Sequence, residues 1–211
     1  MIQDEINRVW LQSYDKNVPE SLHFETIPIF AYLDRAAEKN PKRTALVFNN
    51  WKVSYSKLKS LVETVSANLQ KQGLNRGDRV AVMLPNTPQA VIAYWAILKA
   101  GGIVVMTNPL YMEKELVHHF NDSGAKFLIT IDLLWPKLSP LLSKFNLSKI
   151  FVTRISDTLR FPVNHLYRFK AHREGTAPQV PFDENKIRPW KDLLSKGARL
   201  KEFRPNPDHD L

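Results

Sequence analysis

Residues 79–109, RVAVMLPNTPQAVIAYWAILKAGGIVVMTNP, decide the fold of this chain. The stretch begins and ends with short apolar runs, Arg79–Leu84 and Ile103–Thr107, that lack the alternation of a half-exposed strand. Such runs are typical of parallel strands buried on both faces of a sheet. Between them, Thr87-Pro88 predicts a helix start, with threonine as cap and proline in the first turn. The helix is apolar nearly all round through Leu98, so we expect a β-α-β unit with a buried crossover helix.

The sequence on both sides continues the alternation of strands and helices. This order predicts an α/β fold, with a doubly wound, mostly parallel sheet and flanking helices. The expected helices are Ile29–Lys39, a helix from a Ser56 cap to Gly73, Glu113–Asn121 and a proline-interrupted helix over 133–145; the expected strands are a hairpin of Ala45–Phe48 and Lys52–Tyr55, then Phe127–Ile131 and Lys149–Thr153.

The regular order stops after residue 155. Prolines at 162, 178, 181, 189, 205 and 207 predict that no long element forms beyond it. We therefore divide the chain into an N-terminal extension (1–25), an α/β subdomain (26–155) and a proline-rich basic segment (156–211), which forms a loop-rich C-terminal tail.

Composition limits the classes of function. The 211 residues include no cysteine, which excludes disulfide scaffolds and cysteine-ligated metals, and an excess of 30 basic over 21 acidic residues gives a charge of +9 and favours anionic partners. The first residues carry Asp4 and Glu5 instead of a basic, apolar secretion signal. The most apolar stretch, Ala90–Leu98, is too short to span a bilayer. We expect a cytoplasmic protein, with peripheral association with the inner membrane.

Few of the usual motifs of enzyme sites occur. No phosphate-binding Gly-x-x-x-x-Gly-Lys-Ser/Thr or Gly-x-Gly-x-x-Gly occurs, and no Gly-x-Ser-x-Gly elbow. Gly101-Gly102 follow a helix, so a helix C-cap explains them, and Asp78 is expected to organise a turn. His118 and His119 are adjacent, a spacing at which two helical side chains do not easily share one metal. The residues themselves therefore predict no catalytic, cofactor-binding or metal-ligating position.

Two segments remain as candidate sites. The first is the loop of Asn108, Pro109 and Tyr111, which follows a strand at the edge where open α/β sheets place ligands. It is a candidate substrate-side loop, and a plain proline turn with Tyr111 as packing is the alternative.

The second segment is 160–173, which has four cations, interleaved aromatic residues and no acid. This pattern suits contact with an anionic membrane, and it would also suit single-stranded nucleic acid or a solvated loop packed on its own domain. The candidate membrane contacts are Phe161, Tyr167, Arg168, Phe169, Lys170 and Arg173.

Four motifs in order resemble the adenylate-forming, AMP-binding enzyme superfamily. Val53-Ser-Tyr-Ser-Lys-Leu58 is similar to its Thr/Ser-Tyr-x-x-Leu motif, and residues 74–86 to its Gly-Asp-Arg-Val-Ala…Pro-Asn strand. Residues 98–111 resemble its Lys-Ala-Gly…Asn-Pro motif, and residues 115–126 its Glu-Leu…Asp-Ser-Gly-Ala helix end. The resemblance is to bacterial long-chain fatty-acid–CoA ligases and spans essentially the whole chain.

The resemblance implies an enzyme that uses ATP, Mg²⁺ and coenzyme A to convert a long-chain fatty acid to acyl-CoA through an acyl-adenylate. The family's phosphate loop, adenine motif and lysine-bearing C-terminal domain are not among these residues, and the loop would follow Leu211. We therefore carry over no catalytic residue, and we expect residues 1–211 alone to be inactive and to bind none of the three tightly. We expect self-association and no nucleic-acid partner, although a non-catalytic binding module and a nucleic-acid-binding domain stay open as alternatives.

Overall fold

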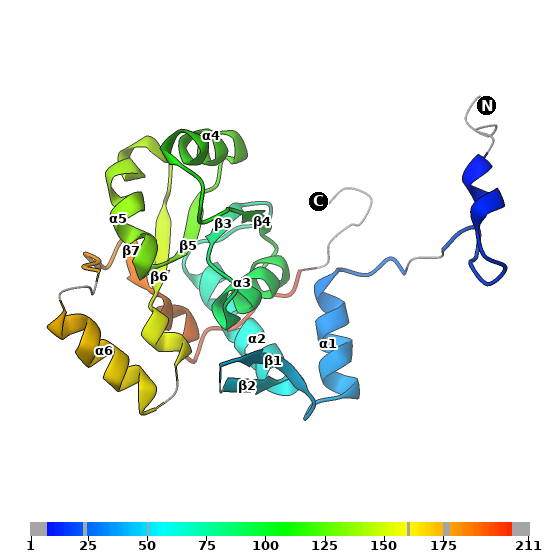
Figure 1. Cartoon of the computed structure of the whole chain (residues 1–211), viewed down its shortest axis with the longest axis horizontal. Helices are drawn as coiled ribbons and strands as arrows, with labels where there is room; N and C mark the ends of the chain where they lie inside the picture. Colours follow the sequence, from blue (N-terminus) through cyan, green and yellow to red (C-terminus); the bar gives the residue numbers. More distant parts are fainter. Residues whose placement is uncertain (1–7, 23–24, 50, 160, 175–177, 204–211) are drawn as a thin grey trace.

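A computed structural model describes residues 8–22, 25–49, 51–159, 161–174 and 178–203. Strands and helices alternate through most of the chain, as the sequence predicts (Figure 1). The elements are η1 (Val9–Ser13), α1 (Phe30–Lys39), β1 (Thr44–Phe48), β2 (Trp51–Ser54), α2 (Tyr55–Lys71), β3 (Arg79–Met83), α3 (Pro88–Lys99), β4 (Ile103–Met106), α4 (Glu113–Ser123), β5 (Phe127–Ile131), η2 (Asp132–Leu134), α5 (Trp135–Leu138), η3 (Ser139–Lys144), β6 (Lys149–Thr153), η4 (Ile155–Thr158), α6 (Val163–Arg173), β7 (Ile187–Pro189) and η5 (Trp190–Leu194), where η marks a 3₁₀ helix.

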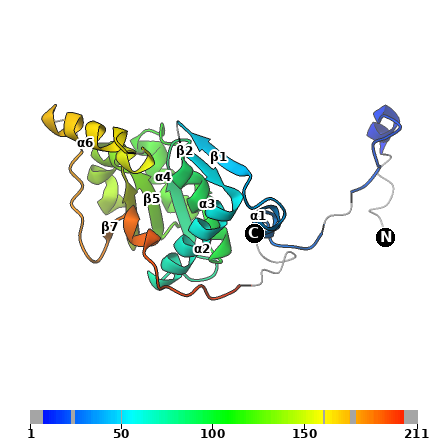
Figure 2. The same ribbon diagram turned by 90° about the horizontal axis from the view of Figure 1, so that it is seen from below.

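The main sheet has five parallel strands in the order β4-β3-β5-β6-β7. Side chains alternate along each strand, so Val80 and Val82 of β3 join the core beneath α2, α3 and η5, whereas Ala81 and Met83 join the core beneath α4, α5 and η3. Helices therefore cover both faces, and the prediction of a doubly wound α/β sheet is confirmed. The antiparallel hairpin β1-β2 forms a separate sheet, and η1 lies away from the body in both ribbon views (Figures 1 and 2).

The boundaries near the hairpin differ slightly from the expected ones. Ser54 caps α2, because its Oγ accepts a hydrogen bond from the Lys57 N–H at 3.3 Å, whereas the sequence suggested Ser56. Ser54 is the last residue with extended backbone, and an N-cap requires that conformation. Asn49 has φ of 50°, the positive value expected for the hairpin turn.

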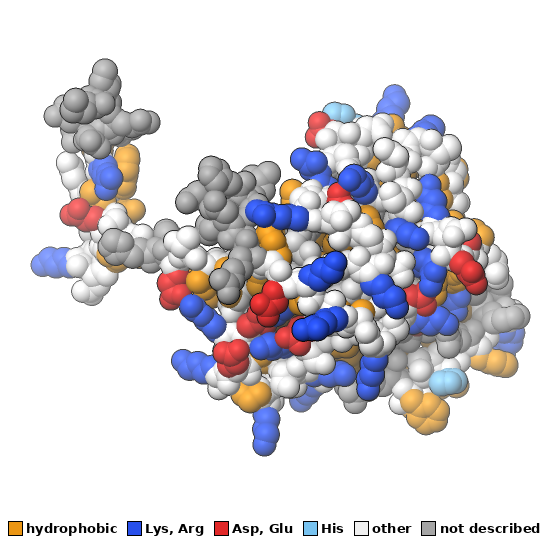
Figure 3. Space-filling model, turned by 180° about the vertical axis from the view of Figure 1, so that it is seen from behind, with side chains coloured by type: hydrophobic (Ala, Val, Ile, Leu, Met, Phe, Trp, Pro, Cys, Tyr) orange, Lys and Arg blue, Asp and Glu red, His pale blue; other side chains and the backbone are white. Residues whose placement is uncertain are grey.

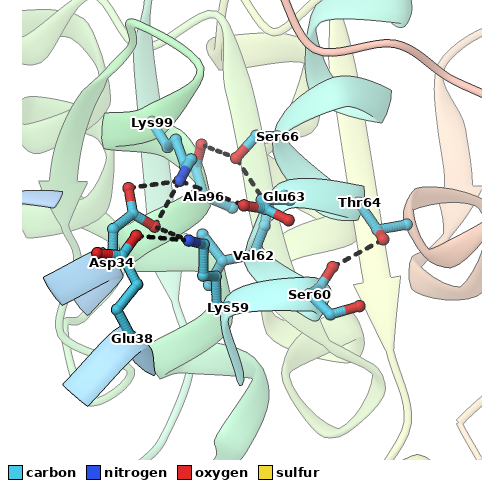
Figure 4. Close-up of polar contacts among 10 residues, drawn as sticks. All are labelled: Asp34, Glu38, Lys59, Ser60, Val62, Glu63, Thr64, Ser66, Ala96 and Lys99. Carbon is cyan, nitrogen blue, oxygen red and sulfur yellow. Dashed lines mark hydrogen bonds and ion pairs between the residues drawn. The ribbon is translucent and has the colours of Figure 1, made fainter. Parts of the chain in front are cut away.

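Helix α1 is tied to α2 and α3 by an ion-pair cluster (Figure 4). The Lys99 Nζ lies 2.7 Å from both carboxylate oxygens of Asp34 and 3.6 Å from Glu63. Lys59 reaches Glu38 at 3.4 Å and Asp34 at 3.9 Å. Since Lys99 is largely buried and the charges form a network, the cluster holds α1 more firmly than an isolated surface pair would.

The segment after residue 155 contains more structure than its prolines predicted. Helix α6 forms between Pro162 and Pro178, because a proline just before a helix costs no hydrogen bond. Strand β7 ends at Pro189 and lies at the edge of the sheet, where a strand tolerates proline. The expectation of no long element was therefore wrong for α6, and the sheet has a fifth parallel strand that the sequence did not predict.

Candidate functional site

The carboxyl ends of β3 and β5 mark the point where the winding of the sheet reverses. The chain passes from β3 through α3 to β4 on one side, then through α4 to β5 on the other side of β3. Open α/β sheets bind ligands in the crevice at such a switch point. We therefore place the candidate functional site at this carboxyl edge, which faces the hairpin end of the molecule (Figure 1).

Two buried polar groups at the start of α3 lack partners among the described residues. Thr87 is the N-cap of α3 and is 6% exposed, but its Oγ1 makes no hydrogen bond, and neither does the Oε1 of Gln89, which is 3% exposed. The sequence predicted Thr87 as the cap, and its position is confirmed, although its hydroxyl bonds no backbone amide. Buried polar atoms are normally paired, so these two are unusual features of the switch point.

Asp132 follows β5 directly and joins the ends of two neighbouring strands. Burial raises the pKa of its carboxyl above the ordinary value, although hydrogen bonds from the backbone N–H groups of Leu133 and Ile155 and the charge of Arg154 oppose the rise. Its chemistry is that of a buried acceptor that fixes the start of η4. Sequence reasoning missed Asp132, although its place directly after a strand could have drawn attention to it.

The loop after β4 is held by a hydrogen bond within the loop and by contacts with α4 and α5. The Asn108 Oδ1 accepts a hydrogen bond from the Leu110 N–H at 3.0 Å, and Lys137 donates to the Pro109 carbonyl at 3.0 Å. Tyr111 packs edge-on against His119, with ring centroids 5.6 Å apart. The predicted substrate-side residues therefore lie together at the carboxyl edge, in a tightly turned loop.

An apolar hollow of about 480 Å³ lies between the hairpin, α3 and the end of β4. Leu46 and Phe48 form one wall, Val91 and Trp95 another, and Thr87 and Asn86 form the polar end next to the switch point. Met106, at the end of β4, is 56% exposed at its rim. A hollow with this lining suits an apolar group that carries one polar end.

The opposite, amino edge of the sheet is built for packing and charge balance. A Cβ on Gly102 would lie 3.0 Å from Ile97 and 3.2 Å from the Asp78 carbonyl, so this pair of glycines allows close packing, as the sequence predicted. Burial alone would raise the pKa of Asp78, but Lys126, at 2.6 Å, and the Asn75 N–H hold that pKa below its ordinary value. Lysine and arginine side chains are scattered over much of the face seen in Figure 3.

The second predicted segment forms α6 and the turn before it. Phe161, Tyr167, Phe169, Lys170 and Arg173 are all exposed, and their contact with a membrane stays a prediction. The Arg168 side chain lies outside the described residues.

Within the described parts of the chain, no group of three or more histidine, aspartate or glutamate side chains is arranged to hold a metal ion. His119 instead pairs through its Nε2 with the Thr107 hydroxyl at 3.1 Å. None of the described helices is long and apolar enough to cross a membrane.

Known proteins resemble this chain over most of its length. The long-chain-fatty-acid–CoA ligase of Bacillus subtilis (strain 168) is 40% identical over 205 residues, which cover 96% of this chain and 36% of that protein. The ligase of the same name from Salmonella typhimurium is 35% identical over 156 residues, which cover 73% of this chain and 28% of that protein. The chain thus spans about a third of the length of these relatives.

Solved structures share the fold at lower identity. A long-chain-fatty-acid–CoA ligase from Archaeoglobus fulgidus superposes with a TM-score of 0.69 at 21% identity and covers 93% of this chain and 35% of that one. Coronafacic acid ligase from Pectobacterium brasiliense superposes with a TM-score of 0.66 at 19% identity and covers 82% of this chain and 30% of that one.

A model of one enzyme family matches most of the α/β unit. That family is described as AMP-binding enzyme, and its model matches residues 33–195. The match extends through β7 and η5, the elements beyond the predicted strands, and it confirms the resemblance carried by the four sequence motifs. The chain belongs to the AMP-binding enzyme family.

Proposed function

We propose that this chain is the first part of a long-chain fatty-acid–CoA ligase. The observation that carries the proposal is the 40% identity to the Bacillus subtilis ligase over 96% of the chain. The remaining length of that relative would supply the elements that bind and position the nucleotide, so the proposal concerns the longer protein.

The reaction of the whole enzyme has two steps. The fatty-acid carboxylate attacks the α-phosphate of ATP, and pyrophosphate leaves with the electrons of the broken P–O bond. The thiol sulfur of coenzyme A then attacks the carbonyl of the acyl-adenylate, loses its proton and displaces AMP. Mg²⁺ would accompany ATP, but the described residues assemble no cluster of carboxylates for it, so we assign no step of the metal to them.

The contribution of this chain is the carboxyl edge of the sheet. The apolar hollow beside Thr87 and the turned loop of Asn108, Pro109 and Tyr111 would form one wall of the approach for the acyl substrate. The two unpaired buried groups at the start of α3 support this assignment, because a polar atom of a ligand or of a later segment would satisfy them.

The test is to express the longest open reading frame that contains these residues. With palmitate, ATP, Mg²⁺ and coenzyme A, the product should release pyrophosphate and form acyl-CoA, and residues 1–211 alone should not exceed a no-protein blank. Absence of palmitate-dependent pyrophosphate release from the long product, or turnover by residues 1–211 alone, would overturn the proposal.

We also infer that the protein works at the cytoplasmic face of the inner membrane. Long-chain fatty acids partition into bilayers, so an enzyme that consumes them gains by contact with the lipid surface.

We infer further that residues 1–211 self-associate when isolated. Val47, Met106, Leu110 and Met112 are exposed around the carboxyl edge, and apolar surface left in water drives contact between copies. Sedimentation of the purified chain at increasing concentration tests this self-association.

A further inference from the structure

Helix α6 presents apolar side chains to solvent instead of to the core. Phe161 is 79% exposed, Phe169 is 68% exposed, and Val163 and Leu166 are also exposed. Its largest set of contacts is with the short η4 that precedes it. Both ribbon views show α6 projecting at one end of the molecule (Figures 1 and 2), and hydrophobic side chains are visible at that end in Figure 3.

The exposed apolar side chains lie toward the N-terminal end of α6, and the exposed cations lie toward its C-terminal end. Val163, Leu166 and Phe169 follow one another at intervals of three, so they lie near one another along the helix. Phe161, in the turn before the helix, packs edge-on against His165, with ring centroids 5.6 Å apart. The cations lie toward the other end, where Lys170 and Arg173 are exposed. Cations near a helix C-terminus also stabilise the helix dipole.

The local charge is one-sided. Residues 161–173 contain no acidic side chain, and Glu174, directly after them, pairs with the Lys170 ammonium at 4.0 Å. A helix with exposed aromatic and aliphatic groups and nearby cations fits the boundary of an anionic bilayer, because the apolar groups enter the acyl region and long cationic side chains reach the phosphates. A protein partner would need an acidic patch matched to this helix, whereas an anionic bilayer carries negative charge over its whole surface.

We propose that α6 is an interfacial helix that lies on an anionic lipid bilayer, with Phe161, Leu166 and Phe169 inserted and Lys170 and Arg173 on the headgroup phosphates. The inference deepens the proposed membrane location by naming the element that makes the contact. Helix α6 follows η4 directly after the carboxyl end of β6, and the hairpin lies at the same end of the molecule (Figure 1). A bilayer on α6 would therefore adjoin the edge of the sheet that carries the apolar hollow.

The test is co-sedimentation of residues 1–211 with vesicles of phosphatidylcholine and phosphatidylglycerol in a 3:1 ratio at low salt. The chain should bind these vesicles, bind pure phosphatidylcholine vesicles at least tenfold more weakly, and be released as salt rises. Failure of the wild type to bind the anionic vesicles would overturn the proposal and leave the proposed ligase activity untouched.

Two variants assign the contact to α6. The apolar variant, Phe161→Ser/Leu166→Ser/Phe169→Ser, should bind at least tenfold more weakly, whereas the control Val18→Ser/Leu22→Ser/Ile29→Ser, which alters exposed apolar side chains elsewhere, should bind as the wild type. Circular dichroism would verify that both variants remain folded. Equal binding by the apolar variant and the wild type would place the lipid contact elsewhere and overturn the assignment.

The charge variant separates electrostatic from apolar contact. Arg168→Ser/Lys170→Ser/Arg173→Ser should weaken binding at least tenfold and reduce its dependence on salt. The control Lys71→Ser/Lys191→Ser/Lys196→Ser removes the same charge from exposed positions outside α6 and should weaken binding less than threefold. Equal losses in the two charge variants would show a nonspecific effect of net charge and contradict the role of α6.

Discussion

Helix α6 and the pair β7–η5 come from the same proline-rich part of the chain, yet their large side chains have opposite environments. Trp190 and Leu193 of η5 are 3% and 0% exposed and belong to the core beneath α2. Phe161 and Phe169, at α6, are among the most exposed large side chains that the structure describes. The composition of the two halves does not predict this difference.

The difference depends on what each half can pair with. The edge of β6 offers unsatisfied backbone groups to β7, and α2 offers Asn68, whose amide donates to the carbonyls of Leu193 and Ser195 at 3.0 and 2.8 Å. Helix α6 satisfies its own backbone and needs no such edge. We propose that the exposed apolar side chains of α6 contact lipid.

The largest expected effect on the free energy of unfolding is at η5. Trp190→Ala should lower the free energy of unfolding by about 3–5 kcal/mol, because it empties a buried site, and Leu193→Ala should cost about 2–5 kcal/mol. Phe169→Ala, on α6, should change the free energy of unfolding by less than about 0.5 kcal/mol. Urea denaturation of the three variants measures the contrast, and similar losses at Trp190 and Phe169 would break it.

The next effect concerns the hydrogen bonds that hold η5. Asn68→Ala should cost about 1–3 kcal/mol, since it leaves the buried carbonyl of Leu193 and the part-buried carbonyl of Ser195 without this donor. Gln70→Ala, two residues further along α2, is the control: its bonds to Lys201 are exposed and its bond to the Ala100 carbonyl is part-buried, so it should cost less than half as much. Equal costs in urea denaturation would show that burial of these bonds is unimportant.

A smaller effect depends on pH and concerns the turn at residues 74–78, which contacts Phe203. The Asp78–Lys126 pair fixes the turn at residues 74–78, and Arg76 in that turn stacks on Phe203 at 4.8 Å. Since the pKa of Asp78 is lowered on folding, its stabilising contribution is full above the ordinary value of 3.8 and is lost as the pH falls through the lower folded-state value.

Asp78→Asn should therefore lower the free energy of unfolding by about 1.5 kcal/mol at pH 7, and the difference from the wild type should shrink as the pH falls below 4. Asp122→Asn, at an exposed position on α4, is the control and should have little effect. Thermal unfolding from pH 7 to pH 3 measures both. A difference that stays constant with pH would refute the role assigned to the carboxylate.

The smallest effect is expected at the switch point. Thr87→Val should change the free energy of unfolding by less than about 0.5 kcal/mol, because the hydroxyl has no partner to lose, whereas a bonded N-cap typically costs about 1 kcal/mol when removed. Urea denaturation of this variant beside Ser54→Ala, which removes a bonded cap, sharpens the contrast. A loss as large as that of Ser54→Ala would show that the hydroxyl is paired in solution.

Local patterns in the sequence were sufficient for most of the fold. The apolar runs at β3, β4, β5 and β6 and the turn residues between them predicted the strands and the winding, because each element is long or apolar enough to be recognised alone. Strand β7 was missed because it has only three residues, one of them proline, and its position depends on the free edge of β6. Helix α6 was missed because the many prolines of this segment suggested interruption, although none of them lies between Val163 and Arg173.

The candidate site was predicted less completely. The strand-end rule identified Asn108, Pro109 and Tyr111, and it applies equally to Asp132, which was not recognised. The unpaired hydroxyl of Thr87 and the adjoining hollow depend on packing between α3 and the hairpin, which no sequence motif reports. The aromatic and basic segment at 160–173 forms a helix where the prolines suggested a loop, and several of its described side chains are exposed. Its predicted contact with a membrane stays a prediction.

Amide hydrogen exchange of residues 1–211, with and without anionic vesicles, tests the contrast between the two halves most directly. Peptides covering 187–195 should be protected in both conditions, because β7 and η5 are held by the sheet and α2. Peptides covering 161–173 should exchange quickly in free protein and at least tenfold more slowly with vesicles. Strong protection of α6 in the free protein, or no change on adding vesicles, would contradict the account.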